Sequence, residues 1–551
     1  MTIPDVHGGV TVQMPAWNAL YQIRDFSEHV QQVEAFAGTA RVPVEKIDKH
    51  TWRIQADGTV VVRYATYWDD SGPFASQLNA DHAFINPAMI LLYVPERRSE
   101  DVQLVLSELL IDWNVASSDF DSAVGVAGST ARTFLLRALN FDALADAPIE
   151  AGKFQQFDLP GISPAISVVV HGDGWNKKHF EDNLTKICKY ELQLMGGAPY
   201  EHYLFIFHIG RGAGGGGMEH ANSTAIAIPS DEYLDGVSAH EFFHLWNVKR
   251  LRPASLVPVD YTKEQYTRAL WFAEGVTSTY GSYTLLRSKL WTKQQFYDDL
   301  AQQISELESR PANRWQSAEQ SSLDAWLEKY PLYNRPEYSV SYYTKGQVLG
   351  VLLDLQIRGR TVDLQSGAKS LDDVFRFMND EFARQNKPYN DSLDVRLAAE
   401  KVAGSSFEDF FQRYVANAEP LPYTETLAIA GLELRKTERR RPTLGFEAER
   451  APEGNLVVRS VDADSNAAAA GLRAGDVIAQ WNKQDPPRRI DRWLRSQKPG
   501  DLVHATVRRE EKQIEIDFHL GESTEVFYQV AEDAQAPEKA KRLRESWLRG
   551  D

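Results

Sequence analysis

The stretch His240-Glu241-Phe242-Phe243-His244 decides how this sequence is interpreted. Two histidines four residues apart on a helix point in directions about 40° apart, so both rings can reach one point. Residues 231–246 have the apolar composition of a buried helix, where an unpaired imidazole would be costly. The alternative is a pair of core histidines without a metal, and this buried setting makes us favour metal binding.

A carboxylate that can complete such a site follows at Glu274, within the apolar residues 271–277. A buried carboxylate needs a partner, which is either a metal ion or a nearby arginine such as Arg268. Catalytic zinc sites use three protein ligands and leave one position open. We therefore expect one Zn²⁺ per chain, bound by His240, His244 and Glu274. Glu241 can then reach a water in the open position and act as the general base.

Two further segments can bring polar groups to this centre. The glycine run 214–217 leaves room for a peptide along a sheet edge, and Glu219 just after it would project a carboxylate into the cleft. Tyr343 precedes an apolar helix, and a tyrosine near the metal can donate a hydrogen bond to the oxyanion of a tetrahedral intermediate. Each signal is weak alone, because glycine loops are often only flexible and tyrosines often belong to cores.

Composition indicates a soluble protein of several domains. The chain has 551 residues, of which 43% are hydrophobic and 25% are charged. Its net charge of -17 argues against a nucleic-acid partner. The single cysteine, Cys188, excludes an intrachain disulfide. The N-terminus lacks the pattern of a secretory signal, and no apolar stretch approaches the ~20 residues that span a bilayer. We therefore expect a cytoplasmic protein without a membrane partner.

The sequence predicts a multidomain α+β fold. We expect a β-rich N-terminal domain over residues 1–165, a catalytic domain over 166–290, an α-helical domain completing the active site over 291–422, a compact domain over 423–525 and a helical tail over 526–551. Asp57-Gly58 predicts a hairpin between strands at 52–55 and 59–64. Further strands are expected at 88–94, 101–106, 166–170 and 203–209.

Helices are expected where apolar residues recur at helical spacing. The predicted helices cover residues 176–194, 347–357, 407–415 and 537–549. Thr292 and Ser370 are predicted N-caps, the latter with Asp373 as in a capping box. The last helix mixes acidic and basic residues, which favours packing on the body of the protein over membrane anchoring.

Four motifs in a fixed order resemble the gluzincin zinc metallopeptidases: Gly217-Met218-Glu219-His220, His240-Glu241-x-x-His244, Trp271-x-x-Glu274-Gly275 and Tyr343-Thr344-Lys345-Gly346. The closest resemblance is to the glycyl aminopeptidase family, whose members carry a C-terminal PDZ domain; the order is also similar, more distantly, to aminopeptidase N. The resemblance implies a thermolysin-like catalytic domain and Tyr343 as oxyanion stabiliser. It also implies that Glu219 recognises the free amino group of the substrate, with Gly217, Met218 and His220 beside it.

Three features depart from aminopeptidase N. Residue 220 is His220 instead of asparagine, and the spacing between His244 and Glu274 is longer. Ser278 stands where thermolysin-like enzymes often carry a carboxylate that orients a ligating histidine. The sequence therefore leaves open which residues orient the metal ligands.

The last predicted domain resembles a PDZ domain. Leu444-Gly445-Phe446, followed by the pattern at 468–478, would form the loop that receives the C-terminal carboxylate of a peptide. The alternative is that the domain packs rigidly and binds nothing.

The expected function is a zinc aminopeptidase that removes small residues, Gly or Ala by resemblance, from peptides with a free N-terminus. One alternative is a zinc metalloendopeptidase, in which Glu219 grips no amino terminus. Another is a PDZ-based peptide-binding adaptor with a degenerate enzyme body, which the intact set of ligands, base and tyrosine opposes.

Overall fold

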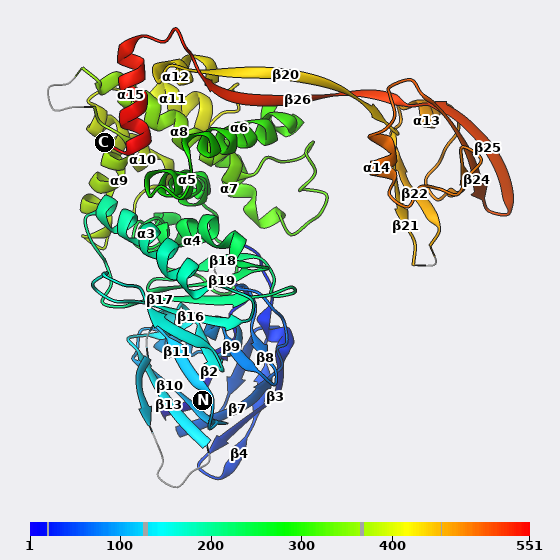
Figure 1. Cartoon of the computed structure of the whole chain (residues 1–551). Helices are drawn as coiled ribbons and strands as arrows, with labels where there is room; N and C mark the ends of the chain where they lie inside the picture. The colour runs from blue at the N-terminus through cyan, green and yellow to red at the C-terminus, as the bar shows by residue number, and fades with distance from the viewer. Residues whose placement is uncertain (19–20, 119, 125–130, 364–367, 453) are drawn as a thin grey trace. The chain divides into compact units, whose positions relative to one another are not determined.

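The computed structural model describes residues 1–18, 21–118, 120–124, 131–363, 368–452 and 454–551. The chain forms two compact units (Figure 1): the first comprises residues 1–433 and 530–551, and the second residues 434–529. The predicted domain at 423–525 and the predicted tail from 526 do not follow these limits, because residues 423–433 and the helix α15 (Glu538–Arg549) belong to the first unit.

The N-terminal part of the first unit is β-rich, as predicted. Its strands form four sheets with the orders β1-β7-β3-β4, β2-β6-β5, β11-β14-β9-β8 and β10-β13-β12. The strands are β1 (Thr2–Val6), β2 (Val10–Gln13), β3 (Val30–Ala37), β4 (Ala40–Val42), β5 (Val44–Lys46), β6 (Thr51–Ile54), β7 (Gly58–Thr66), β8 (Gln77–Leu78), β9 (His82–Ile85), β10 (Val102–Leu110), β11 (Asn114–Ser117), β12 (Phe120–Val124), β13 (Ala131–Ala138) and β14 (Ile149–Gly152).

Strands form on both sides of Asp57-Gly58, but the predicted hairpin is wrong. β6 pairs with β2 and β5, whereas β7 pairs with β1 and β3 in another sheet. The side chain of Asp57 accepts a hydrogen bond from the backbone N–H of Gly8, 2.6 Å away, instead of closing a turn. Ile54, Val60 and Val62 then meet face to face in one core, so burial between sheets outweighs the local turn signal.

The strand predicted at residues 88–94 is also wrong. The helix α1 (Pro87–Ile90) occupies its first half, with proline at the first helical position, where its missing N–H costs nothing. Of the remaining residues, Tyr93 forms an isolated bridge with Gln13. The strand predicted at 101–106 is confirmed as β10.

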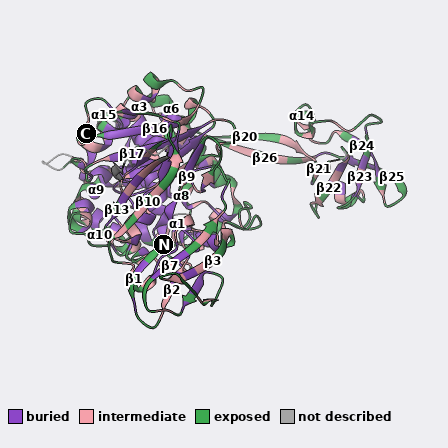
Figure 2. Ribbon diagram, turned by 90° about the horizontal axis from the view of Figure 1, so that it is seen from below, coloured by how far each residue is buried: buried purple, intermediate pink, exposed green. Residues whose placement is uncertain are grey.

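A five-stranded sheet joins the N-terminal part to the helices, with the order β15-β16-β17-β19-β18. Its strands are β15 (Gln155–Asp158), β16 (Ile166–Gly172), β17 (Tyr203–Ile209), β18 (Gly216–Glu219) and β19 (Ser223–Ile228). β16, β17 and β19 are parallel and largely buried (Figure 2), which confirms the strands predicted at 166–170 and 203–209. β18 runs antiparallel to β19 at the edge, so its outer side is not paired with another strand of this sheet.

Helices lie on the side of this sheet away from the N-terminal strands, with α3 (Lys177–Met195) and α4 (Leu234–Phe243) next to it (Figure 1). The others are α5 (Thr277–Arg287), α6 (Lys293–Ser309), α7 (Ala318–Leu323), α8 (Tyr342–Thr361), α9 (Leu371–Met378), α10 (Asp391–Ala403), α11 (Glu408–Phe410), α12 (Tyr423–Ile429) and α15. The capping boxes at Thr292 and Ser370 are present, with Gln295 and Asp373 as partners. α15 buries Trp547 against the rest of the first unit, as its pattern predicted.

The second unit has its own hydrophobic core. The chain enters it through β20 (Leu432–Thr443) and leaves through β26 (Gly521–Glu532), which pair with each other. Between them lies a sheet with the order β21-β22-β23-β24-β25, formed by β21 (Phe446–Arg450), β22 (Leu456–Val461), β23 (Val477–Trp481), β24 (Leu502–Arg509) and β25 (Lys512–His519), with the helices α13 (Asn466–Ala469) and α14 (Ile490–Leu494). Leu444 and Gly445 connect β20 to β21, whose first residue is Phe446.

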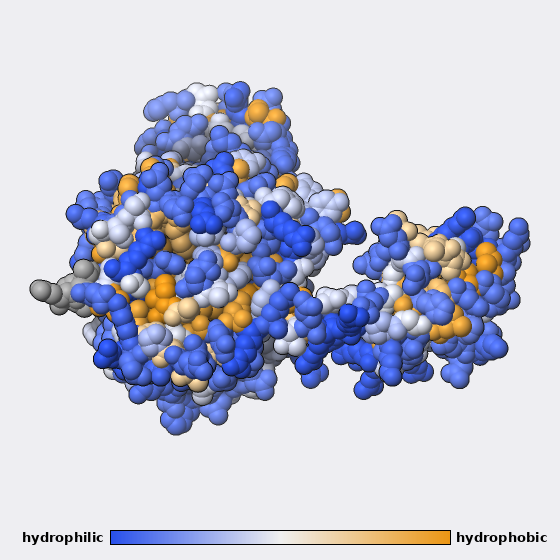
Figure 3. All heavy atoms as spheres, turned by 90° about the horizontal axis from the view of Figure 1, so that it is seen from above, coloured by the Kyte–Doolittle hydropathy of each residue, from blue (hydrophilic) through white to orange (hydrophobic). Residues whose placement is uncertain are grey.

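Hydrophilic residues dominate the face of the molecule drawn in Figure 3, and apolar residues gather in a hollow of the first unit. In the described part of the chain, none of the helices combines the length and the apolarity that crossing a membrane requires.

Candidate zinc centre

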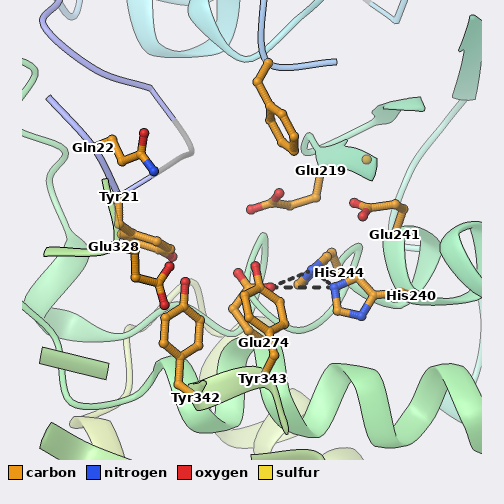
Figure 4. Close-up of a pocket in the computed structure, with 12 residues that line it drawn as sticks. Tyr21, Gln22, Glu219, His240, Glu241, His244, Glu274, Glu328, Tyr342 and Tyr343 are labelled. Carbon is orange, nitrogen blue, oxygen red and sulfur yellow. Dashed lines mark hydrogen bonds and ion pairs between the residues drawn. The ribbon is translucent and has the colours of Figure 1, made fainter. Parts of the chain in front are cut away.

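The two histidines of the central motif meet at the C-terminal end of α4. His240 lies in its last turn and His244 directly follows it. Their Nε2 atoms are 2.9 Å apart, and Glu274 Oε2 lies 3.6 Å from His240 Nε2 and 3.3 Å from His244 Nε2 (Figure 4). The structure thus brings together the three predicted zinc ligands, which we call the triad.

In each neutral ring, the hydrogen bond at Nδ1 determines which nitrogen carries the proton. His244 Nδ1 donates to the carbonyl oxygen of Asn247 at 2.6 Å. The hydroxyl of Ser278 donates to the carbonyl of Glu274 at 3.1 Å, so it accepts from His240 Nδ1 at 3.3 Å. In the neutral rings both Nε2 atoms then carry lone pairs directed at the Glu274 carboxylate. Three converging lone pairs fit a Zn²⁺ ion, whose protein ligands are neutral imidazoles and carboxylates.

Electrostatics in the triad favours one positive charge at its centre, which a proton on His244 would supply in the absence of a metal ion. Burial would lower the pKa of His244, but Glu274 outweighs burial and raises it to about 10. His240 is half-buried, and desolvation together with His244 lowers its pKa. The two imidazoles in turn keep the pKa of Glu274 well below its usual range despite burial. The carboxylate is therefore ionised and ready to bind a cation.

Backbone packing explains how Glu274 reaches the histidines. Residues Trp271–Val276 form a π-helix, a wide turn that is frequent at functional sites. A Cβ on Gly275 would lie only 2.5 Å from Gly346 Cα, so glycine at both positions lets this turn press against the first turn of α8. That contact sets Glu274 beside Tyr343. The amide of Asn247 donates to the carbonyl of Phe272 at 2.8 Å and ties the π-helix to the histidine helix.

β18 presents Glu219 to the same cavity. Alternate residues of a strand face the same side, so Gly217 and Glu219 face the triad, and Met218 faces the opposite side. A Cβ on Gly217 would overlap the Glu241 carboxyl group, which explains the glycine. His220 is buried and its Nδ1 lies 3.1 Å from Asp146, outside the zinc cavity.

Glu241 is 5% exposed, and its Oε2 atom has no hydrogen-bond partner among the described residues. Burial raises the pKa of this carboxyl group to about 8, with further contributions from Glu219 and Glu274 and an opposing one from His244. A carboxyl group poised near neutral pH suits proton transfer.

The cavity around the triad collects groups from the whole first unit. The ring of Tyr343 is centred 6.1 Å from that of His240 (Figure 4). The residues that line the cavity are Tyr21, Gln22, Phe74, Gly217, Glu219, His240, Glu241, His244, Glu274, Glu328, Tyr342 and Tyr343. Tyr21, Gln22, Phe74 and Glu328 belong to no motif, and no local pattern marks them.

Two family profiles match the chain. The profile described as M61 glycyl aminopeptidase matches residues 234–349, and that of the M61 peptidase N-terminal domain matches residues 1–153. The crystal structure of an aminopeptidase N family protein from Idiomarina loihiensis is similar over 99% of this chain and 96% of that chain, with a TM-score of 0.86 and 26% sequence identity. An M1 zinc metallopeptidase from Deinococcus radiodurans aligns over 76% of this chain and 89% of that chain, with a TM-score of 0.47 and 12% identity. No curated protein sequence matches.

Together the fold and the matched residues define a zinc metallopeptidase. The first profile spans the triad, Glu241 and Tyr343, and the second spans the β-rich part that precedes them. Over residues 1–153 and 234–349 the chain is thus similar to the M61 glycyl aminopeptidase family. The hypothesis of an adaptor with a degenerate enzyme body is therefore set aside.

Proposed function

We propose that this zinc aminopeptidase hydrolyses the first peptide bond of peptides whose free N-terminal residue is small, glycine or alanine. The observation that carries the proposal is the position of Glu219. Its carboxylate lies on the edge strand β18 and lines the same cavity as the triad (Figure 4). A peptide added along that edge would place its terminal ammonium against Glu219, where an ion pair makes burial of the charge tolerable.

Five residues of the zinc cavity then take part in the reaction. His240, His244 and Glu274 would hold one Zn²⁺, which when bound polarises the scissile carbonyl and makes water more acidic. Glu241 accepts a proton from the attacking water and returns it to the leaving amine. Tyr343 donates a hydrogen bond to the oxyanion that forms at the carbonyl.

The test compares a peptide with a free N-terminus and the same peptide acetylated there. We expect cleavage one residue at a time from the amino end, and none of the acetylated peptide. Glu219→Gln should weaken transition-state binding of free-amine substrates by roughly 2–5 kcal/mol, as when one partner of a buried charge pair is removed. The matched control is Glu232→Gln, an exposed glutamate just before α4, which should leave kcat/KM unchanged. Internal cleavage of the acetylated peptide at a comparable rate would establish the endopeptidase instead.

We also propose that the second unit is a PDZ domain that receives a peptide C-terminus at Leu444, Gly445 and Phe446. Gly445 has φ +71° and a Cβ there would overlap the side chain of Ser465, so this turn requires glycine. The turn leads into β21, an edge strand to which a peptide strand could be added. Binding of a peptide library to the full chain should be lost when the peptide C-termini are amidated, and Gly445→Val should abolish it.

A further inference from the structure

Two neighbouring cavities of the first unit share two lining residues, one of them aromatic. The zinc cavity lies on one side. The second cavity has largely apolar walls that include Trp17, Met218, Val248 and Leu256. Tyr21 and Glu219 line both cavities.

We propose that Tyr21 is the specificity-determining residue of the enzyme: its ring closes the zinc cavity against the second cavity and so admits only small N-terminal side chains. This inference rests on the proposed aminopeptidase function. The ring of Tyr21 would exclude larger N-terminal side chains from the second cavity, which they would otherwise fill.

The chemistry of an amino terminus places the side chain of the first residue here. The ammonium group and the side chain share one Cα, so a substrate whose ammonium pairs with Glu219 must direct its side chain to the walls next to Glu219. Tyr21 forms one of these walls, and Figure 4 shows its ring on the side of the cavity opposite His240. The hydrogen of glycine and the methyl of alanine need little room beside this ring, whereas the branched side chain of leucine needs more.

Aromatic packing holds the ring of Tyr21 in place. It packs edge-on against Trp326 at 6.2 Å between ring centres, and Trp326 packs edge-on against Trp17 at 5.1 Å. Trp17 Nε1 donates to the carbonyl of Asp260 at 2.7 Å, and Trp326 Nε1 donates to that of Gln265 at 3.0 Å. The partition is thus supported by two anchored indoles, so swinging it aside for a large substrate would disrupt their packing.

The second cavity suits the side chains that the partition excludes. Met218 is 2% exposed and Val248 is 7% exposed, so part of its wall is packed and apolar. Its lining also holds charged residues, of which Lys249 is paired with Asp146 at 2.8 Å and Asp142 with Arg98 at 2.7 Å. Truncating Tyr21 would join the two cavities and offer a leucine or methionine side chain an apolar environment.

The experiment uses full-length, zinc-loaded enzyme and aminoacyl substrates that begin with Gly, Ala, Leu or Met. Tyr21→Ala should raise the ratio of kcat/KM for Leu over Ala at least about 10-fold, the discrimination expected for a few methylene groups in an apolar pocket. Tyr21→Phe should keep the wild-type ratio, because the ring and not the hydroxyl forms the partition. The matched control Tyr67→Ala removes a tyrosine that is 68% exposed and should change nothing. Adding Val248→Phe to Tyr21→Ala should refill the second cavity and restore the preference for small residues.

The outcomes separate this inference from the proposed function. A wild-type enzyme that cleaves none of the free-amine substrates would refute the aminopeptidase itself. A wild-type enzyme that cleaves Leu as well as Ala, or a folded, zinc-loaded Tyr21→Ala with an unchanged ratio, would overturn the partition alone. If Tyr21→Ala does not fold, Tyr21→Val, which keeps part of the apolar packing, gives the same decision.

Discussion

The described residues of the first unit include two clusters of two histidines and one glutamate, which differ in where their protons lie. In the triad, each Nδ1 donates away from the centre, so the Nε2 lone pairs face Glu274. In the second cluster, formed by His82, Glu150 and His208, each carboxylate oxygen of Glu150 faces one imidazole nitrogen at 2.9 Å.

In the second cluster, hydrogen bonds satisfy the facing nitrogen and oxygen atoms without a metal ion. The amide nitrogen of Gln77 donates to Asp69 at 2.9 Å, so its oxygen faces His82 Nε2 at 3.1 Å and accepts from it. His82 Nδ1 faces Glu150, another acceptor, so the partners of His82 call for protons on both nitrogens. Glu150 is 0% exposed, whereas the triad lines a cavity that Glu241 and Glu219 also line. Residue types and proximity therefore do not separate a metal centre from a buried ion pair; the hydrogen-bond directions do.

The largest effect on zinc content and activity is expected when the triad is disrupted and the second cluster is left intact. Purified enzyme should hold one Zn²⁺ per chain, and His240→Ala should lose both the zinc and the activity, because two ligands no longer close the site. His82→Gln should keep one zinc and measurable activity. Elemental analysis of both variants checks this, and two zinc ions per wild-type chain would show that the second cluster binds metal as well.

Replacing Glu150 should mainly affect stability. Glu150→Gln leaves buried imidazoles without their carboxylate, and loss of one partner of a buried charge pair costs about 3–5 kcal/mol. His208 and His82 keep the pKa of Glu150 below its usual value despite burial, so this contribution is complete above the unfolded pKa and is lost as pH falls through the lower folded value. Urea unfolding of metal-free protein should show the deficit at pH 7 and a smaller one at ~pH 3.5. A deficit that stays constant would contradict the ion pair.

Loss of the Tyr343 hydroxyl should slow turnover while leaving substrate binding nearly unchanged. Tyr343→Phe removes the proposed donor to the oxyanion and should lower kcat by roughly 10²–10³ with little change in substrate affinity. Tyr338→Phe, a 47% exposed tyrosine ahead of α8, serves as the control. Rapid-mixing kinetics separates the chemical step from binding; an unchanged rate would make the neighbouring Tyr342 the better candidate.

Removing the group that orients His240 should weaken zinc binding without abolishing it. Ser278→Ala deletes the acceptor of the Nδ1 proton, and such losses typically cost about 10–100-fold in metal affinity. Ser288→Ala, after the end of the same helix, should have no effect. Chelator competition measures both, and equal zinc affinities would mean that the helix backbone alone orients the ring.

The smallest effect is expected from removal of the second unit, which contributes no residue to either cluster. Gly431 and Asp533 are joined by a backbone hydrogen bond of 3.0 Å, so a short glycine linker in place of residues 434–529 should preserve the first unit. Hydrolysis of a short aminoacyl substrate should stay within about twofold, since the unit folds around its own core. A large loss in a folded, zinc-loaded protein would show that the second unit contributes to catalysis.

The parts of the structure that sequence could predict are those fixed by local spacing. The histidine pair at i and i+4, the N-caps at Thr292 and Ser370 and the apolar strand β17 each lie within a few residues. The hairpin at Asp57-Gly58 was also a local signal, but packing between two sheets outweighed it.

The missed features depend on residues far apart in the chain. Ser278 and Asn247 orient the triad through a hydroxyl and a carbonyl, which no motif identifies. The second cluster joins three strands, and Tyr21 reaches the zinc cavity from the N-terminal part of the chain. No periodicity in the sequence predicts such long-range contacts, because they follow from how the sheets pack.

The position of α15 has a consequence for the order in which the protein can be made. Trp547 donates to the hydroxyl of Tyr283 at 2.8 Å, and Arg287 donates to the carbonyl of Trp547 at 3.1 Å, both on the helix that carries Ser278. During synthesis the ribosome must complete the whole second unit before these partners emerge. The catalytic unit therefore reaches its final packing only after the second unit has been made, and a nascent chain paused within the second unit holds a nearly complete peptidase that still lacks α15.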